Sequence, residues 1–227
     1  MKTTLKNTKI IVIANQKGGC GKTTISVHLA CGILKLQPTS KVLIINTDLQ
    51  RSANLWADNQ EKFNFKILSS QDNLINLIEK ENGHYDYLII DTPPATDQSA
   101  DSLVVYGALL VADLLIVPIL CSALDLWATG NFETTIEEAL KENPALKVYL
   151  LLNRYQARFK RTKRTVNLIT ETIPYPILTS KLAERNAFID SADFGVTVYE
   201  LNDQKAITEV NQLTKEIISI LESKKDE

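Results

Sequence analysis

Residues 16–24 read Gln-Lys-Gly-Gly-Cys-Gly-Lys-Thr-Thr and are separated from the apolar run 10–14 only by Asn15. Glycines let backbone amides approach a phosphate closely, and a helix that begins near Lys22 adds positive charge at its N-terminus. The usual phosphate-binding pattern starts with glycine, but that position is Gln16 here, and a second lysine, Lys17, is present. The segment therefore predicts a strand, a variant phosphate-binding loop and a helix in succession.

The loop residues have distinct expected roles. Lys22 would reach the β- and γ-phosphates, and the Thr23 hydroxyl would bind Mg²⁺. A plain strand-to-helix turn remains the alternative for the whole segment, and an exposed charge on the loop shoulder remains the alternative for Lys17. The residues predicted to contact the nucleotide here are Lys17, Gly18, Gly19, Cys20, Gly21, Lys22, Thr23 and Thr24.

Two buried strands end in carboxylates, Asp48 after the run 41–46 and Asp91 at the end of 86–91. In an open parallel sheet, ligands lie outside the carboxyl ends of the strands, so both acids would face the phosphates. One carboxylate fits an outer position around Mg²⁺, and the other fits the orientation of an attacking water. Helix capping is the alternative role for each.

Apolar runs alternate with helix-length segments along the whole chain, which predicts an α/β fold. The near-continuous Ile, Val and Leu content of the runs indicates burial on both faces, hence a doubly wound, mostly parallel sheet flanked by helices. We expect one domain over 1–227, since no repeat or linker divides the 227 residues. The predicted strands are 9–14, 41–46, 64–68, 86–91, 113–118 and 147–152, with a shorter one near 175–178.

With the loop and both acids in place, the chain resembles the ParA/MinD group of deviant Walker-A ATPases. Within that group it looks most like small plasmid-partition ParA proteins of the ParF kind. The resemblance extends nearly from end to end. The segments that carry it are 16–24, 46–56, 85–94, 117–126 and 185–200.

The resemblance implies roles for individual residues. Lys17 would cross a dimer interface to the partner's ATP, Asp48 would serve hydrolysis, and Asp91 would be the Walker B acid near Mg²⁺. Asn153, at the end of a strand, lies where relatives place an adenine-contacting side chain. The implied catalytic set is Lys17, Lys22 and Asp48, and the implied metal set is Thr23, Asp48 and Asp91.

Three positions depart from the family pattern. Asn46 replaces the first acid of the D-x-D segment, Leu49 replaces its proline, and Cys121 stands where relatives often carry proline or a polar residue. Asparagine can still donate a hydrogen bond but removes one negative charge near the metal. We therefore expect weaker Mg²⁺ binding or slower turnover, and we make no prediction of adenine packing at Cys121.

A basic segment at 154–164 carries no acid, although the whole chain has a formal net charge of −2. Such a cluster of positive charge could bind DNA phosphates without recognising the DNA sequence. A solvated loop and helix start is the alternative, and Arg158 could instead belong to the dimer interface. The residues predicted to bind DNA are Arg158, Lys160, Arg161, Lys163, Arg164 and Arg185.

The resemblance implies a DNA-partition ATPase that dimerises on ATP and Mg²⁺, binds nonspecific DNA, and is switched off when a ParB- or ParG-like partner stimulates hydrolysis. A cytoplasmic placement is expected, because the cysteines lack paired spacing and no apolar run reaches about 18 residues, and the resemblance implies association with the nucleoid. The alternatives are a MinD-like membrane-associated positioning ATPase and a metabolic P-loop synthetase. The predicted last helix, 203–222, has the apolar spacing of core packing and few basic residues, which disfavours membrane binding.

Overall fold

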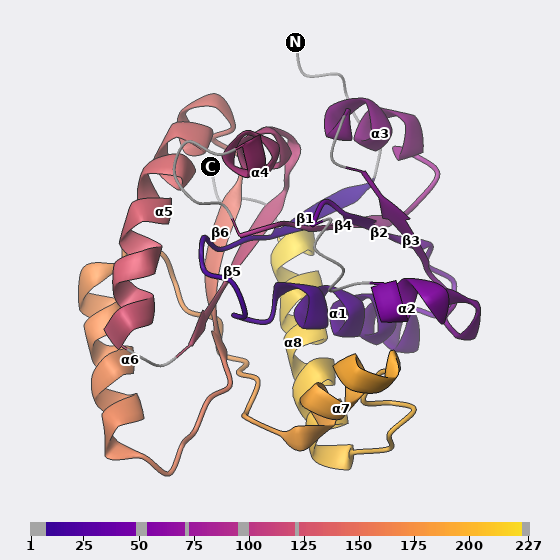
Figure 1. Cartoon of the computed structure of the whole chain (residues 1–227). Helices are drawn as coiled ribbons and strands as arrows, with labels where there is room; N and C mark the ends of the chain where they lie inside the picture. Colours follow the sequence, from indigo (N-terminus) through magenta and orange to yellow (C-terminus); the bar gives the residue numbers. More distant parts are fainter. Residues whose placement is uncertain (1–7, 49–53, 71–72, 95–99, 121–122, 224–227) are drawn as a thin grey trace.

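The computed structural model describes residues 8–48, 54–70, 73–94, 100–120 and 123–223. In this part of the chain six parallel strands form one sheet in the order β3-β2-β4-β1-β5-β6 (Figure 1). The predicted α/β class and the parallel sheet are thus confirmed. The strands are β1 Lys9–Ile13, β2 Val42–Asn46, β3 Lys66–Ser69, β4 Tyr87–Asp91, β5 Leu114–Leu120 and β6 Lys147–Asn153.

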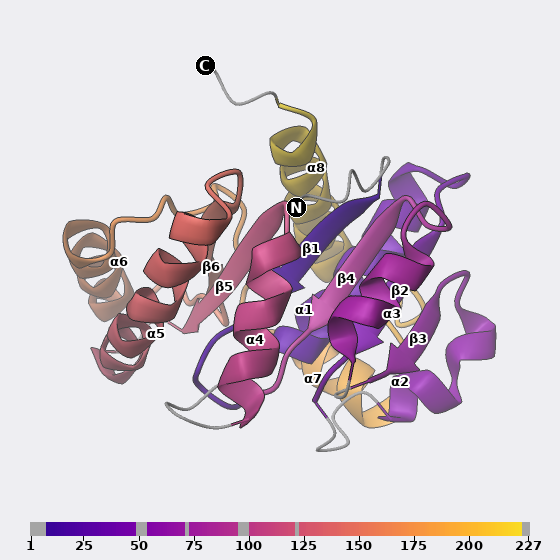
Figure 2. The ribbon, with the colours of Figure 1, turned by 90° about the horizontal axis from the view of Figure 1, so that it is seen from above.

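Helices cover both faces of the sheet, as Figures 1 and 2 show from two directions. One face is covered by α1 Lys22–Leu36, α2 Asn54–Asp58, α7 Asn186–Phe194 and α8 Gln204–Glu222. The other face is covered by α3 Leu74–Glu81, α4 Ala100–Val111, α5 Ala123–Glu142 and α6 Lys160–Thr172. A short 3₁₀ helix, Gln60–Lys62, follows α2.

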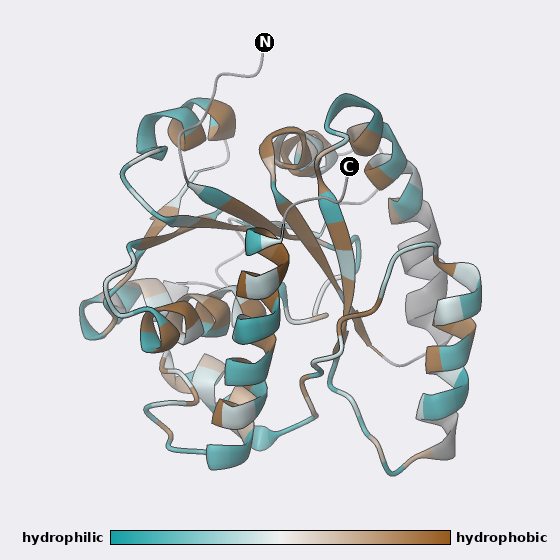
Figure 3. Cartoon of the chain, turned by 180° about the vertical axis from the view of Figure 1, so that it is seen from behind, coloured by the Kyte–Doolittle hydropathy of each residue, from teal (hydrophilic) through white to brown (hydrophobic). Residues whose placement is uncertain are grey.

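Side chains along each strand alternate between two hydrophobic cores. In β1, Ile11 and Ile13 pack with α1, α7 and α8, whereas Ile10 and Val12 pack with α3, α4 and α5. Figure 3 shows this as strands that are apolar nearly throughout, between helices of mixed hydropathy. Because both faces are buried, the strands read as continuous apolar runs in the sequence, which is why their positions were predictable.

The strand boundaries agree with the predictions to within two residues, with one exception. In place of the strand expected near 175–178 there is a single parallel bridge between Ile177 and Leu150 of β6, and Ile177 belongs to no named strand. Leu150 N donates to Pro176 O, and Leu178 N donates to Leu150 O. Pro174 and Pro176 lack the N–H groups that a longer ladder would need, so the prediction of a strand there is wrong.

The last helix packs as the sequence predicts. Asp203 caps α8 by accepting hydrogen bonds from the amides of Lys205 and Ala206, and the apolar face of the helix is buried. The carboxylate of Glu216 accepts hydrogen bonds from Thr179 N and Ser180 N, so this acid is used inside the fold. Within the described residues, no helix has the length and apolar character needed to cross a membrane.

Candidate nucleotide site

The glycine-rich loop joins the end of β1 to the start of α1 in the way the sequence predicts. Gly19 and Gly21 adopt φ values of 74° and 95°, which other residues rarely adopt, and Gly21 is the N-cap of α1. Because glycine has no side chain, no side-chain cap hydrogen bond is made at the N-terminus of α1. Cys20 is buried, in keeping with a space-filling role at this variable position.

The end of β6 holds the loop from the opposite side. Asn153 Nδ2 donates to Cys20 O at 2.8 Å, and Asn153 Oδ1 accepts from Arg154 N at 2.9 Å. Both ends of this buried amide are therefore engaged with backbone. The structure places Asn153 beside the loop, as expected for a site residue, but its hydrogen bonds fix the loop. Its predicted contact with adenine stays a prediction.

Asn15, which the sequence analysis did not single out, connects the start of the loop to β5 through hydrogen bonds. Its side chain donates to Pro118 O at 2.7 Å, and its Oδ1 accepts from Lys17 N at 2.9 Å. Lys22 is buried, and its Nζ donates to Asn15 O and Lys17 O at 3.3 and 3.2 Å. A polar residue closing an otherwise apolar strand was the available signal for Asn15.

Asp91 lies at the base of the loop and is almost completely buried. Burial is the main reason that its pKa is raised to about 7, and the nearby Asp48 carboxylate adds to that effect. Hydrogen bonds from Thr23 and Ser26 and the charge of Lys22 act in the opposite direction. Ser26, whose Oγ lies 3.4 Å from Asp91 Oδ1, is a further site residue that the sequence analysis missed.

The second oxygen of Asp91 matches a role near a metal. Among the residues that the structure describes, Asp91 Oδ2 is buried and has no hydrogen-bond partner. A cation would compensate the cost of burying such an oxygen. The described chain holds no group of three or more His, Cys, Asp or Glu residues suited to a metal. Asp91, with Asp48 nearby, offers one or two carboxylates. Such a site fits Mg²⁺, which usually keeps several waters and binds one or two carboxylates together with substrate phosphates.

Asp48 lies beside Asp91 because their strands are neighbours. Asn46 and Asp91 are register partners in β2 and β4, and Thr47 N and Oγ1 both donate to Asp91 O at 2.9 Å. Asp48 is 8% exposed, so its carboxylate is close to buried at the carboxyl edge of the sheet. The two strand-end acids that the sequence predicted for one site are therefore brought together.

A cleft of about 320 Å³ opens next to the loop. Gly21 and Thr24 of the loop and helix α1 form one wall, and Asn153 and Arg154 form the end near β6. Ile25 of α1 adds to the apolar lining, most of which comes from the segment after β6 and from α7. Those further lining residues are Leu182, Phe188, Ile189 and Ala192. A mixed apolar and polar cleft of this size beside a phosphate-binding loop suits a nucleoside.

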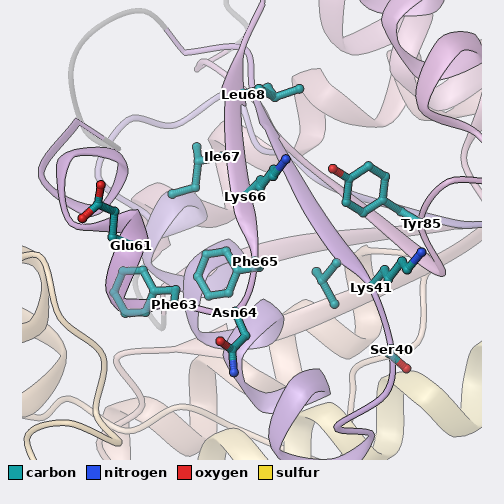
Figure 4. A pocket seen from close by; sticks show the side chains of 11 residues that line it. Ser40, Lys41, Glu61, Phe63, Asn64, Phe65, Lys66, Ile67, Leu68 and Tyr85 are labelled. Atoms are coloured by element: carbon teal, nitrogen blue, oxygen red, sulfur yellow. The ribbon is translucent and has the colours of Figure 1, made fainter.

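A larger hollow of about 580 Å³ lies elsewhere, along the edge strand β3. Figure 4 shows Phe63 and Phe65 side by side in its wall, with ring centroids 5.0 Å apart and nearly parallel planes. Lys41 and Lys66 also line it. None of the predicted site residues contributes to this hollow, so its size gives no reason to move the site.

The basic segment begins where β6 ends, directly after Asn153. Its backbone leads from the end of the edge strand β6 into α6, which lies beside α5 (Figures 1 and 2). Arg158, Lys163 and Arg164 are exposed. Arg158 also lies 4.8 Å from the centre of the Phe159 ring. Three predicted DNA-binding cations are thus accessible on one continuous segment adjoining the loop.

Arg185 has a different setting from the other predicted DNA-binding residues. Its guanidinium forms a salt bridge with Glu209 of α8, and this hydrogen bond raises its pKa. Ala183 N donates to the other oxygen of Glu209 at 2.9 Å. Arg185 also lines the cleft beside Gly21. Its charge is therefore already balanced within the fold, and its DNA contact stays a prediction.

Some predicted positions lie outside the described residues. Leu49 and Cys121 are among them, so neither departure from the family pattern has a structural account here. The backbone of α6 is described at Lys160 and Arg161, but their side chains are not.

Comparison with known proteins was consistent with this geometry. The family described as "CobQ/CobB/MinD/ParA nucleotide binding domain" matches residues 11–198, a range that includes the loop, both acids and Asn153. Maintenance of carboxysome distribution protein A from Halothiobacillus neapolitanus is 31% identical over 215 residues, which are 92% of this chain and 95% of that protein. Chromosome partitioning protein ParA from Myxococcus xanthus is 26% identical over 194 residues, 66% of each chain.

A solved structure shares the fold. Cobyrinic acid a,c-diamide synthase from Mycobacterium smegmatis, with bound ADP and magnesium, aligns with a TM-score of 0.73 at 19% identity. The alignment covers 95% of this chain and 96% of that one. The resemblance to ParA and MinD is therefore confirmed at the level of the family, while the ParF-like refinement stays a prediction. The chain belongs to the CobQ/CobB/MinD/ParA nucleotide-binding family.

Proposed function

We propose that this chain is a ParA-type positioning ATPase that binds ATP with Mg²⁺, dimerises on ATP and then binds DNA without sequence preference. The observation that carries the proposal is the juxtaposition at the end of β1. There the loop with Lys17 and Lys22 adjoins the carboxylates of Asp48 and Asp91. The exposed basic segment begins directly after Asn153, which donates a hydrogen bond to the loop.

Each site residue has a role in this proposal. Residues 17–24 bind the phosphates, Lys22 within its own subunit and Lys17 across the dimer. Asp48 orients the attacking water. Thr23, Asp48 and Asp91 hold Mg²⁺, which would offset the charge that develops on the transferred phosphoryl group. The cleft lined by Thr24, Asn153 and Phe188 takes the nucleoside.

The connection from β6 to α6 supports a link between nucleotide and DNA. Asn153 binds the loop, and the residues that follow it lead to exposed Arg158, Lys163 and Arg164. A shift of the loop on ATP binding or dimerisation would therefore move the start of the basic segment. Two copies in one dimer would double the positive charge that faces the DNA, which favours binding to phosphates.

The cargo has two candidates. In the first, the protein segregates DNA, and a ParB- or ParG-like centromere-binding partner stimulates hydrolysis and releases the dimer in the nucleoid-containing cytoplasm. The name of the Halothiobacillus relative favours a second candidate, distribution of a protein compartment, with an adaptor of its own as partner. Both use the same ATP cycle and differ in the protein that stimulates it.

Two other activities compete with this proposal. A MinD-like membrane-associated ATPase would sediment with anionic liposomes when ATP is present. The burial of the apolar face of α8 argues against that helix as a lipid contact. A metabolic P-loop synthetase would show ATPase activity that does not respond to DNA.

The test is binding of the purified protein to nonspecific duplex DNA with ATP, with ADP and without nucleotide, over a series of salt concentrations. We expect binding with ATP only, falling steeply as salt rises. Equal binding in all three states, or no binding in any, would contradict the proposal. Liposome sedimentation with ATP, run in parallel, would then separate the two rivals.

A further inference from the structure

Asn46 ends β2 and takes the place of the first acid of the D-x-D segment. Its side chain closes a ring with the backbone of Asp48, two residues further on. Asn46 Nδ2 donates to Asp48 O at 3.0 Å, and Asp48 N donates to Asn46 Oδ1 at 3.0 Å. Asn46 is 2% exposed, so water does not compete for either bond.

An aspartate could not make this ring. A carboxylate accepts hydrogen bonds but donates none when ionised, so it would place an oxygen against the Asp48 carbonyl. It would also add a negative charge at the register partner of Asp91, a buried acid. The amide is thus the group that satisfies both the N–H and the C=O of Asp48 at this position.

The residue between them is fixed as well. Thr47 donates its backbone N–H and its hydroxyl to Asp91 O, which ties the segment to β4. With position 47 attached to the neighbouring strand and both backbone groups of Asp48 attached to Asn46, little rotation is left at Asp48. The direction in which its carboxylate leaves the backbone is therefore set by the Asn46 amide.

We infer that Asn46 is a positioning residue for ATP hydrolysis, which acts by holding the backbone of Asp48 so that its carboxylate meets the attacking water. The inference rests on the proposed role of Asp48. It departs from the sequence-based expectation that asparagine at this position weakens the site, because the amide here replaces a lost charge by rigidity. A misplacement of about 1 Å in a catalytic group can cost on the order of 100-fold in rate.

The experiment is a double-mutant cycle. Single-turnover ATP hydrolysis is measured for the unmodified protein, Asn46→Ala, Asp48→Ala and the double variant, and affinity is measured separately with a fluorescent ATP analogue. We expect Asp48→Ala to slow hydrolysis by about 100-fold and Asn46→Ala by about 10-fold. ATP affinity should stay within about 3-fold in both. Since Asn46 acts through Asp48, the double variant should be no slower than Asp48→Ala.

Two further variants guard against a merely structural effect. Asn46→Asp keeps the volume of the side chain and should be as slow as Asn46→Ala. Asn143→Ala removes another buried asparagine, which donates to Leu109 O and Ala112 O before β6 begins, and should leave the rate unchanged. This control reports the cost of losing a buried amide outside the site.

The outcomes separate the two proposals. Equal slowing by Asn46→Ala with and without Asp48, or an Asn46→Asp rate equal to that of the unmodified protein, would overturn the positioning role. If Asn143→Ala slowed hydrolysis as much as Asn46→Ala, the effect would be general destabilisation and the inference would fail. Unchanged turnover in Asp48→Ala would instead remove the proposed role of Asp48 itself.

Discussion

The side-chain amide of Asn153 occupies the space that a Cβ at position 21 would need. A Cβ built on Gly21 would lie 2.3 Å from Asn153 Nδ2, the atom that donates to Cys20 O. The loop and the end of β6, more than 130 residues apart in the chain, are therefore fitted to each other. Two requirements meet at Gly21, a positive φ and close approach of a neighbouring side chain.

Because of this contact, alanine substitutions at the two loop glycines, Gly19 and Gly21, should differ in their effect on stability. Gly19→Ala should lower the free energy of unfolding by about 1–2 kcal/mol, because φ at Gly19 is positive. No steric clash adds to this cost, since a Cβ at Gly19 would have nothing within 4 Å. Gly21→Ala should cost about 1–3 kcal/mol more, since Asn153 must also give up its bond to Cys20 O. Urea denaturation of both variants checks this. Equal losses would contradict the fit between Gly21 and Asn153.

Alanine substitutions of the two loop lysines, Lys17 and Lys22, should remove different steps of the ATP cycle. Lys22→Ala should abolish ATP binding, because the buried Lys22 ammonium is already held inside the loop of its own subunit. Lys17→Ala should keep ATP affinity within about 10-fold but lose ATP-dependent dimers and DNA binding. Isothermal titration and light scattering with ATP measure the two effects. A Lys17→Ala protein that dimerised and bound DNA normally would rule out the sandwich arrangement.

Charge reversal in the basic segment should weaken DNA binding. The double variant Lys163→Glu, Arg164→Glu should reduce the slope of log K against log salt by about 2, one for each lost phosphate contact. A matched control makes the same charge change at exposed Lys80 and Lys141, which lie at the C-terminal ends of α3 and α5. If the control weakened binding equally, net charge rather than this segment would be responsible.

Stability should depend on pH through His28. This histidine is buried, its Nδ1 lies 2.7 Å from Thr24 O, and its Nε2 accepts from Val198 N. Burial lowers its pKa from 6.5 to about 4, so between these values the unfolded chain binds a proton that the folded chain does not. The contribution of His28 to the free energy of unfolding should therefore fall by on the order of 3 kcal/mol as pH decreases from 6.5 to 4. Asp91, whose pKa is raised to about 7, contributes in the opposite direction over this range, so the His28 contribution has to be read from a variant.

The contribution of His28 can be isolated from that of the carboxylates. His28→Gln should remove this contribution, so the free energy of unfolding should fall less, or rise more, than in the unmodified protein as pH decreases from 6.5 to 4. His84→Gln, at an exposed position, should leave the curve unchanged. Denaturation at a series of pH values gives both curves. Parallel curves for His28→Gln and the unmodified protein would show that the titrating groups lie elsewhere.

The six strands, the loop and the two acids at the carboxyl edge could all be predicted from the order of the residues. These features are local: apolar runs specify buried strands, and glycines at 19 and 21 permit the backbone turn that leads into α1. A parallel sheet then brings strand ends to one edge, so Asp48 and Asp91 could be placed in one site without coordinates.

The hydrogen-bond partners of the buried and half-buried polar side chains depend on the packing of distant segments and could not be predicted from the sequence. Asn153 binds the loop carbonyl, Glu209 binds Arg185, and Glu216 binds the amides of Thr179 and Ser180. Hydrogen-bond partners far apart in the chain are chosen by packing, since a buried polar group must be satisfied by whatever the fold brings near it. The prolines after α6 reduced an expected strand to one bridge for a different reason, since they lack the N–H groups that a longer ladder needs.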